Sequence, residues 1–162
     1  MNKVFFKLEQ SAASTGHRKV PFGKQHEVEQ KLTETIREHY KNGIRDFLCG
    51  MAIGFDMVAA EAVTNLKKEL PYIRLIAVVP YRGQCERWTA TLQNKYRELL
   101  NQADRIIILS ERYFNGCLLR RNDFLLANTN HIIAFFNGKE QGGTYYTTKK
   151  AKSSNKRITN IY

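Results

Sequence analysis

The sequence predicts an α/β fold built on a mostly parallel sheet with helices on both faces. Short runs of β-branched and aromatic residues alternate along the chain with longer segments of helical periodicity. Two of the short runs, at 73–79 and 105–109, are almost continuously apolar, as expected of strands covered on both faces. This alternation of strand and helix is typical of parallel sheets joined by crossover helices.

The first strand is the least regular of the expected elements. The segment VFFKLEQSAASTGHR begins with apolar residues, but polar residues at 7–10 and small residues after them interrupt the pattern. A central parallel strand should not contain such an interruption. Two alternatives therefore stay open: a short strand at 12–15, or an added edge element at the extreme N-terminus.

The other elements follow from periodicity and from helix stop signals. Apolar residues at every fourth position from Val28 to Tyr40, followed by Gly43, predict an amphipathic helix. Further helices are expected around 59–70, ended by Pro71, around 88–99 and 121–128, and from about Thr144 onward. Further strands are expected at 45–49, 73–79, 105–109, 131–136 and 157–161.

Length and cysteine content limit the class of protein. A chain of 162 residues suits one domain, so residues 1–162 are expected to form a single unit. No apolar run approaches the roughly 18 to 20 residues that span a bilayer, and no secretory signal is present. Cys49, Cys85 and Cys117 are odd in number and widely spaced, which favours a reducing cytoplasm over disulfides or a zinc site. No metal site is predicted.

The charge balance favours anionic partners. Lys and Arg number 26 against 15 Asp and Glu, a formal net charge of +11. Such a surplus attracts anions over long range. It does not distinguish a nucleotide, a polynucleotide and a solvated basic surface from one another.

Candidate binding residues follow the expected strands, because open parallel sheets bind ligands beyond the carboxyl ends of their strands. Each of these loops carries glycine or proline, a hydrogen-bonding side chain, or both. The candidates are Thr15, Gly16, His17, Arg18, Gly50, Met51, Ala52, Gly54, Asp56, Pro80, Gln84, Trp88, Tyr113, Arg121, Asn122, Gly142, Gly143 and Thr144.

Two glycine-containing turns have the form of an anion site. A helix N-terminus presents unpaired N–H groups and about half a positive charge, and glycine lets backbone approach a phosphate closely. Gly142 and Gly143 precede an expected helix, which Thr144 can cap unless it donates to an anion. In the other turn Gly54 permits a tight approach, and Asp56 either caps helical N–H groups or accepts from a ligand hydroxyl.

Several candidates also have ordinary structural alternatives. His17 and Arg18 suit a phosphate or ribose contact, or a capping histidine beside a surface arginine. Core packing suits Trp88 better than stacking on a base. Tyr113, Arg121 and Asn122 fit binding, surface or capping roles alike.

Together the motifs resemble a known family. Thr-Gly-His-Arg at 15–18, Gly-Met-Ala-Ile-Gly-Phe-Asp at 50–56 with Ala-Glu at 60–61, Pro80 with Gln84 and Trp88, Arg-Asn at 121–122 and Gly-Gly-Thr at 142–144 resemble the YpsA-like branch of the SLOG superfamily. The resemblance extends from residue 15 to about residue 151. It implies a three-layer Rossmann-like fold, related to the DNA-processing protein DprA and to LOG phosphoribohydrolases. It also implies a pocket for a nucleotide-derived ligand, such as an ADP-ribose-like molecule.

The chain departs from the LOG motif Pro-Gly-Gly-x-Gly-Thr-x-x-Glu, whose acid assists N-glycosidic cleavage. The proline and the third glycine are absent, and Thr147 occupies the position of the acid. The LOG reaction has no obvious catalyst here unless Asp56 or Glu61 substitutes. The interrupted first strand is a second departure.

The sequence is therefore compatible with three functions. The first is binding or sensing of a mononucleotide or an ADP-ribose-like molecule. The second is a hydrolase that cleaves an N-glycosidic or phosphate bond of such a ligand, with Asp56 or Glu61 as acid or base. The third is DprA-like binding of single-stranded nucleic acid, which requires stacking aromatics in a basic groove. No membrane partner is expected, and a homo-oligomer stays open.

Overall fold

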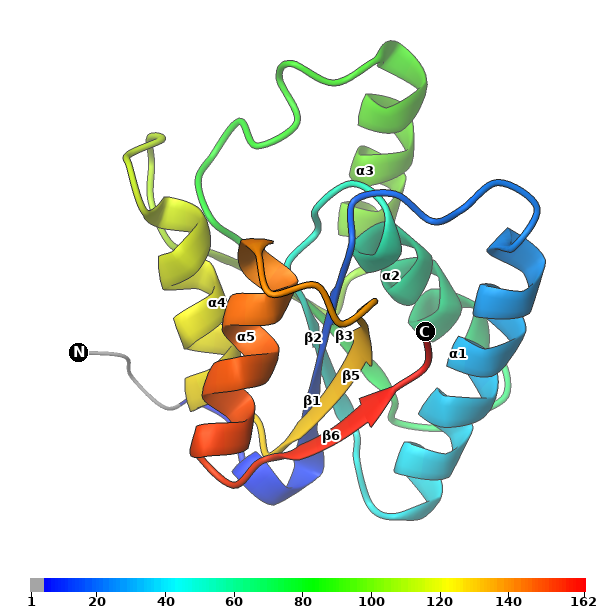
Figure 1. Ribbon diagram of the computed structural model, residues 1–162. Coiled ribbons are helices and arrows are strands. Elements are labelled where there is room, and N and C mark those ends of the chain that lie inside the picture. Colours follow the sequence, from blue (N-terminus) through cyan, green and yellow to red (C-terminus); the bar gives the residue numbers. More distant parts are fainter. Residues whose placement is uncertain (1–4) are drawn as a thin grey trace.

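Six strands form one parallel sheet in the computed structural model, which describes residues 5–162 (Figure 1). The strand order is β4-β3-β2-β1-β5-β6, and every neighbouring pair is parallel. The strands are β1 (Ser11–Gly16), β2 (Asp46–Cys49), β3 (Arg74–Val79), β4 (Arg105–Ile108), β5 (His131–Phe135) and β6 (Arg157–Asn160).

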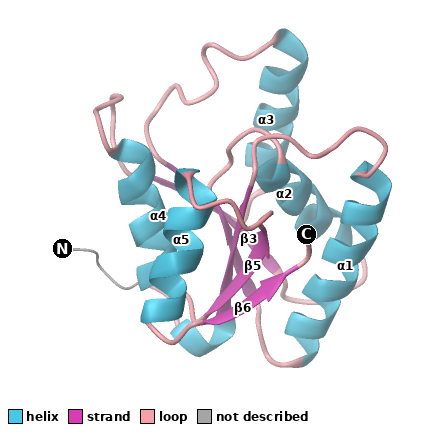
Figure 2. Cartoon of the chain, in the orientation of Figure 1, coloured by secondary structure: helices cyan, strands magenta, loops and turns pink. Residues whose placement is uncertain are grey.

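Helices cover both faces of this sheet, so the predicted three-layer Rossmann-like α/β architecture is confirmed (Figures 1 and 2). On one face lie α1 (Gln25–Lys41), α2 (Phe55–Leu66) and α3 (Ala90–Gln102), and on the other lie α4 (Cys117–Ala127) and α5 (Gly142–Ser153). Within the described residues, no helix is both long and apolar enough to cross a membrane.

The two faces have separate apolar cores because successive residues of a strand point to opposite sides. In β3, Leu75 belongs to the core beneath α1, α2 and α3, while its neighbour Ile76 belongs to the core beneath α4 and α5. Both side chains are fully buried. This double burial explains why the strand is almost continuously apolar in the sequence.

The strand order places a topological switch point at the centre of the sheet. From β1 the chain builds outward through β2, β3 and β4, and then returns to add β5 on the other side of β1. The crossover that leaves β1 through α1 runs over one face of the sheet, and the crossover that reaches β5 through α4 runs over the other. This arrangement leaves a crevice beyond the carboxyl ends of β1 and β5. The loops that follow β1 to β5 gather at this end of the sheet (Figure 1).

The structure confirms the first of the two alternatives for the first strand. β1 is a short strand, and residues Leu8–Gln10 before it form one 3₁₀ turn. The expected N-terminal edge element would include residues 1–4, which lie outside the described residues.

Three expectations for the elements were wrong. Helix α2 (Phe55–Leu66) begins and ends about one turn before the expected 59–70, so Pro71 does not end it. Residues 105–109 do not form a strand covered on both faces: β4 is an edge strand, and Ile106 is 46% exposed. Helix α4 begins at Cys117, about one turn before the expected start near Arg121. Gly116, with φ of 94°, adopts the left-handed conformation that precedes the helix.

Candidate ligand-binding site

A cavity of about 510 Å³ lies at the carboxyl ends of the central strands. Its walls come from the end of β1, the start of α2, the loop before α4 with the first turns of that helix, and the start of α5. The structure brings these predicted residues together around it: Thr15, Gly16, His17, Arg18, Ala52, Asp56, Tyr113, Arg121, Asn122, Gly142, Gly143 and Thr144.

Three helices begin at this cavity without a side-chain cap. The residues preceding α2, α4 and α5 are Gly54, Gly116 and Gln141, and none of their side chains accepts a hydrogen bond from the helix. The first amides of α2 and α4 donate to the carbonyls of His17 and Phe114, both at 3.1 Å, while the amides of Gly142 and Gly143 make no such bond to a described residue. The dipole of each helix adds positive potential at its start. This end of the fold is therefore electrostatically suited to an anion.

Thr144 does not cap α5, contrary to one of its two expected roles. The helix begins two residues earlier, at Gly142, and Thr144 lies inside the first turn. Gly142 has φ of 87°, a backbone conformation that residues other than glycine rarely adopt. Thr144 is buried and lines the cavity.

Arg121 is a buried cation on the α4 wall of the cavity. Only 6% of its surface is exposed. Its Nε donates a hydrogen bond to Asn122 Oδ1 at 3.0 Å, and its Nη1 donates to the carbonyl oxygen of Gly50. Burial lowers the pKa of Arg121, and the charge of Asp56 acts against this effect. An arginine stays protonated under such conditions, so the cavity keeps a fixed positive charge.

Asp56 is the only acidic residue among the described residues that line the cavity. It is 7% exposed, and its Oδ2 accepts a hydrogen bond of 3.2 Å from the amide of Ala52. Burial raises the pKa of Asp56, while Arg121 and the Ala52 amide counteract that rise. No ion pair joins Asp56 to Arg121 among the bridges of residues 5–162. The buried carboxyl group of Asp56 and the buried guanidinium of Arg121 thus line one cavity without forming a direct ion pair.

Two further polar groups lie on the β1 wall. The hydroxyl of Ser14 is buried and is the only such side-chain atom in the described chain without a hydrogen-bond partner. His17 Nε2 accepts a hydrogen bond of 2.9 Å from the amide of Asn137, which requires an unprotonated Nε2. Burial lowers the pKa of His17, consistent with a neutral ring.

Gly54 and Gly16 are needed for packing within the protein. A Cβ on Gly54 would collide with the backbone carbonyl of Arg18, and Gly54 has φ of 91°. A Cβ on Gly16 would collide with the ring of Phe55. The amide of Phe55 donates to the carbonyl of His17 at 3.1 Å, which joins the same two loops. The tight approach expected at Gly54 is thus made to the chain's own backbone.

Other predicted residues lie outside the cavity. Gln84 is buried, with its Nε2 donating to the Gly50 carbonyl at 3.2 Å and its Oε1 accepting from Tyr96 at 3.0 Å. Trp88 packs against the core, with its ring centroid 5.2 Å from that of Tyr96. Met51 and Pro80 are buried next to their strand ends.

Glu61 is also remote from the cavity lining. Its carboxylate forms an ion pair with Lys95 on α3 at 2.8 Å, at the surface between α2 and α3. Thr147, at the position of the LOG acid, is buried, and its hydroxyl donates back to the Gly143 carbonyl at 2.9 Å. Neither residue presents a carboxylate to the cavity.

Sequence reasoning missed part of the α4 wall and the unpaired serine. Ser14, Asn115, Gly116, Cys117, Leu118, Leu119, Leu125 and Gln141 line the cavity but were not predicted. The Asn-Gly pair at 115–116 is a turn signal that would have placed the start of α4 one turn earlier.

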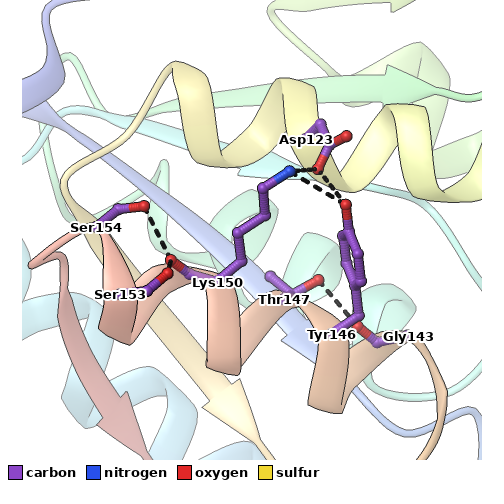
Figure 3. A network of polar contacts seen from close by, with 7 residues as sticks. All are labelled: Asp123, Gly143, Tyr146, Thr147, Lys150, Ser153 and Ser154. Atoms are coloured by element: carbon purple, nitrogen blue, oxygen red, sulfur yellow. Dashed lines mark hydrogen bonds and ion pairs between the residues drawn. The ribbon is translucent and has the colours of Figure 1, made fainter.

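A polar cluster joins α4 to α5, whose N-termini flank the cavity (Figure 3). Asp123 Oδ1 on α4 accepts from Tyr146 Oη at 2.8 Å and from Lys150 Nζ at 2.7 Å. Lys150 also donates to Tyr146 Oη at 3.1 Å. This cluster fixes the two helices relative to each other.

The described residues contain no group of three or more His, Cys, Asp or Glu side chains that could hold a metal ion. Burial raises the pKa of Cys49 to about 12, so its thiol is protonated at neutral pH.

Comparisons with known proteins agree with this architecture. A family model described as the YspA SLOG family (YpsA) matches residues 15–161. A UPF0398 protein of Brevibacillus brevis is 33% identical over 101 residues, which cover 61% of this chain and 54% of that protein. The chain thus spans about half the length of this relative. The SPbeta prophage-derived protein YoqJ of Bacillus subtilis is 28% identical over 128 residues, covering 71% of this chain and 75% of YoqJ.

Two solved structures share the fold. DprA of Streptococcus pneumoniae superposes with a TM-score of 0.65 at 17% identity, covering 91% of this chain and 48% of that one. DprA of Helicobacter pylori gives a TM-score of 0.60 at 21% identity, covering 93% and 64%. At these identities the likeness concerns the fold alone.

Proposed function

Since the chain belongs to the YspA SLOG family, we propose that it binds or senses a nucleotide or a nucleotide-derived small molecule. The ligand is a mononucleotide or an ADP-ribose-like molecule, held in the cavity beyond the carboxyl ends of β1 and β5. Its phosphate lies against the start of α5, where Gly142 and Gly143 leave backbone amides accessible.

One observation carries this proposal: the uncapped starts of three helices and the buried cation of Arg121 meet at one cavity. A charge-assisted hydrogen bond contributes roughly 1.5 to 3 kcal/mol, so two or three of them anchor a phosphate. The cavity volume of about 510 Å³ falls in the range of small-molecule sites.

Asp56 favours a ligand that has a hydrogen-bond donor as well as a phosphate. A carboxylate inside a cationic cavity accepts hydrogen bonds from hydroxyl or amino groups, and it repels phosphate. A ribose hydroxyl attached to a phosphate satisfies both Asp56 and the helix starts. Inorganic phosphate satisfies only the helix starts.

A thermal-shift screen tests the proposal directly. ADP-ribose, NAD, AMP and cyclic nucleotides are added separately, with adenosine and inorganic phosphate as controls. Binding stabilises the fold by RT ln(1 + [L]/Kd), about 2.7 kcal/mol at a hundredfold excess over Kd. At least one nucleotide is expected to raise the melting temperature well above both controls. No shift with any nucleotide would refute the proposal.

Hydrolysis of the ligand is a second candidate, favoured by the buried acid. Burial raises the pKa of Asp56, as general acids and bases require, and Asp56 lines the cavity. Glu61 is no longer a candidate for this role, because it pairs with Lys95 outside the cavity. Chromatography would reveal base released from AMP by the natural protein and not by Asp56→Asn. Absence of release by the natural protein rules this function out.

Binding of single-stranded nucleic acid is a third candidate. It is favoured by the net charge of +11 and by an aromatic pair next to the start of α5, with Tyr145 stacked on Phe136 at 6.3 Å. Lys149 Nζ lies 5.6 Å from the Tyr145 ring centroid. The Helicobacter pylori neighbour is described by a single-stranded DNA binding mode. Affinity for a single strand should then fall steeply with salt, and a flat response would dismiss this function.

A further inference from the structure

We propose that the loop before α4 forms a subsite for a planar aromatic ring, with Tyr113 as the stacking side chain and Tyr81 as its support. This inference rests on the proposed function and deepens it. The ligand then carries a heteroaromatic base as well as its anionic group, so that sugar phosphates and inorganic phosphate are poor ligands.

The lining of the cavity is divided by polarity. The segment from Tyr113 to Leu119 contributes its large apolar side chains, Tyr113, Leu118 and Leu119. The walls from β1 and the start of α5 contribute hydroxyl groups, glycine backbone and the imidazole of His17. A ligand that has only a phosphate and a sugar leaves the apolar wall in water.

Tyr113 has an open face for a ring. It is 63% exposed, although it lines the cavity. Its ring meets that of Tyr81 edge to face, with centroids 5.4 Å apart and an interplanar angle of 82°. In such a pair one ring directs its edge at the other, so Tyr81 covers at most one face of Tyr113. The other face is accessible to a base.

The loop that carries Tyr113 is held in place by the loop after β3. The amide of Arg82 donates to the Ser110 carbonyl at 2.9 Å. The Arg82 guanidinium makes a two-pronged ion pair with Glu111, at 2.7 and 3.1 Å. Ser110 Oγ donates to the Arg112 carbonyl at 2.7 Å, which tightens the turn just before Tyr113. A side chain that is already positioned loses less conformational entropy when a ligand stacks on it.

An exposed aromatic side chain alone is ordinary on a protein surface. Phe22, for example, is fully exposed and does not line the cavity. Tyr113 differs because the same cavity also holds the buried Arg121 and the uncapped start of α5. An aromatic platform and an anion site within one cavity match the two ends of a nucleotide.

Calorimetric titration of AMP and of ribose 5-phosphate tests the subsite, because ribose 5-phosphate has a hydroxyl group where AMP carries the base. The natural protein should bind AMP at least about fivefold more tightly, since stacking contributes roughly 1 to 3 kcal/mol per base. Tyr113→Ala should weaken AMP binding by about tenfold and leave ribose 5-phosphate within about twofold. Tyr113→Phe keeps the ring and should preserve AMP affinity. Phe22→Ala is the matched control and should change neither ligand.

Each other result overturns the subsite. Equal affinity of the natural protein for both ligands shows that the base has no site, whatever the variants do, while the proposed function stands. Undiminished AMP binding by Tyr113→Ala, or equal loss of both ligands, assigns Tyr113 no role in stacking. If the natural protein binds neither these ligands nor any nucleotide of the thermal-shift screen, the proposed function fails together with the subsite.

Discussion

The guanidinium of Arg121 donates a hydrogen bond to the backbone carbonyl of Gly50, 71 residues away in the sequence. The same carbonyl accepts from Gln84 Nε2 at 3.2 Å. Gly50 therefore joins three segments that follow three different strands: its own turn, the loop after β3, and α4. A side chain at this position has no room, because a Cβ would lie 2.5 Å from Arg121 Nη1.

Gly50→Ala is therefore expected to lower stability. Displacing the buried guanidinium should reduce the free energy of unfolding by about 1 to 3 kcal/mol, the usual cost of overpacking. Urea denaturation measures this change. Gly143→Ala is the matched control, because a Cβ there would be 3.5 Å from Asn122 Nδ2, an ordinary contact. Equal stability of the two variants would show that Arg121 moves aside freely.

Gly143→Val should weaken ligand binding more than it lowers stability. The added methyl groups lie at the start of α5, where the proposed phosphate is bound, and Gly143 does not have a positive φ. We expect affinity for the nucleotide found in the screen to fall by about tenfold or more. The cost to unfolding should stay below about 1 kcal/mol, since valine is a normal helix residue. Equal damage to binding and folding would make the glycine purely architectural.

Asp56→Asn should alter the pH dependence of stability. Burial raises the pKa of Asp56 in the folded protein above its ordinary value of 3.8. Its contribution to stability is therefore fully present below pH 3.8 and is lost as pH rises through the folded-state pKa. The free energy of unfolding of the natural protein should fall relative to that of the asparagine variant across this window. Urea titrations at several pH values measure the difference, and a constant difference would contradict the raised pKa.

Asp56→Asn should also lower the affinity for ligands that carry ribose hydroxyls. The carboxylate of Asp56 accepts from the Ala52 amide through Oδ2. An asparagine carbonyl can retain that bond, but it is a weaker acceptor toward the ligand. A variant that is at least as stable at neutral pH and yet binds less tightly would separate the two roles of Asp56.

Most elements of the fold were predictable because their signals are local. The four-residue spacing from Val28 to Tyr40 marks α1, and the apolar run at 73–79 marks β3. The exposure of β4 was not predictable in this way. Isoleucines at 106–108 are equally apolar at the edge of a sheet and at its centre, and strand order alone decides which they occupy.

The residues that line the candidate cavity were predictable only as a set of loops. The rule that ligands bind beyond strand ends led to Asp56, Arg121 and Gly143, which do line one cavity. It also selected Gln84 and Trp88, whose side chains pack inward. Loop chemistry looks the same in both cases, because the direction of a side chain depends on tertiary packing. The unpaired hydroxyl of Ser14 lies inside a strand, where no loop rule applies.

Lys150→Met should loosen α4 from α5. Lys150 and Tyr146 both donate to Asp123, but the lysine and aspartate side chains remain 47% and 25% exposed. Solvent screening therefore limits the expected loss of stability to about 0.5 to 1 kcal/mol. The loss should shrink only in part at 1 M salt, because the 2.7 Å contact is shorter than the screening length of about 3 Å. Lys152→Met, on the same helix outside this cluster, is the control, and an equal loss there would refute the specific contribution.

Glu111→Gln tests whether the loop that carries Tyr113 is positioned before a ligand arrives. The ion pair with Arg82 lies at the surface, so no change in the urea midpoint is expected. Hydrogen bonding to Arg82 lowers the pKa of Glu111, so the pair persists at every pH above the ordinary glutamate range and is lost only as pH falls below it. Without the pair, Tyr113 has more conformations to lose when a base stacks on it. AMP binding should then weaken by about two- to fivefold between pH 6 and 8, with ribose 5-phosphate unaffected. Unchanged AMP affinity would mean that the Tyr81 ring and the Arg82 amide suffice to hold the platform.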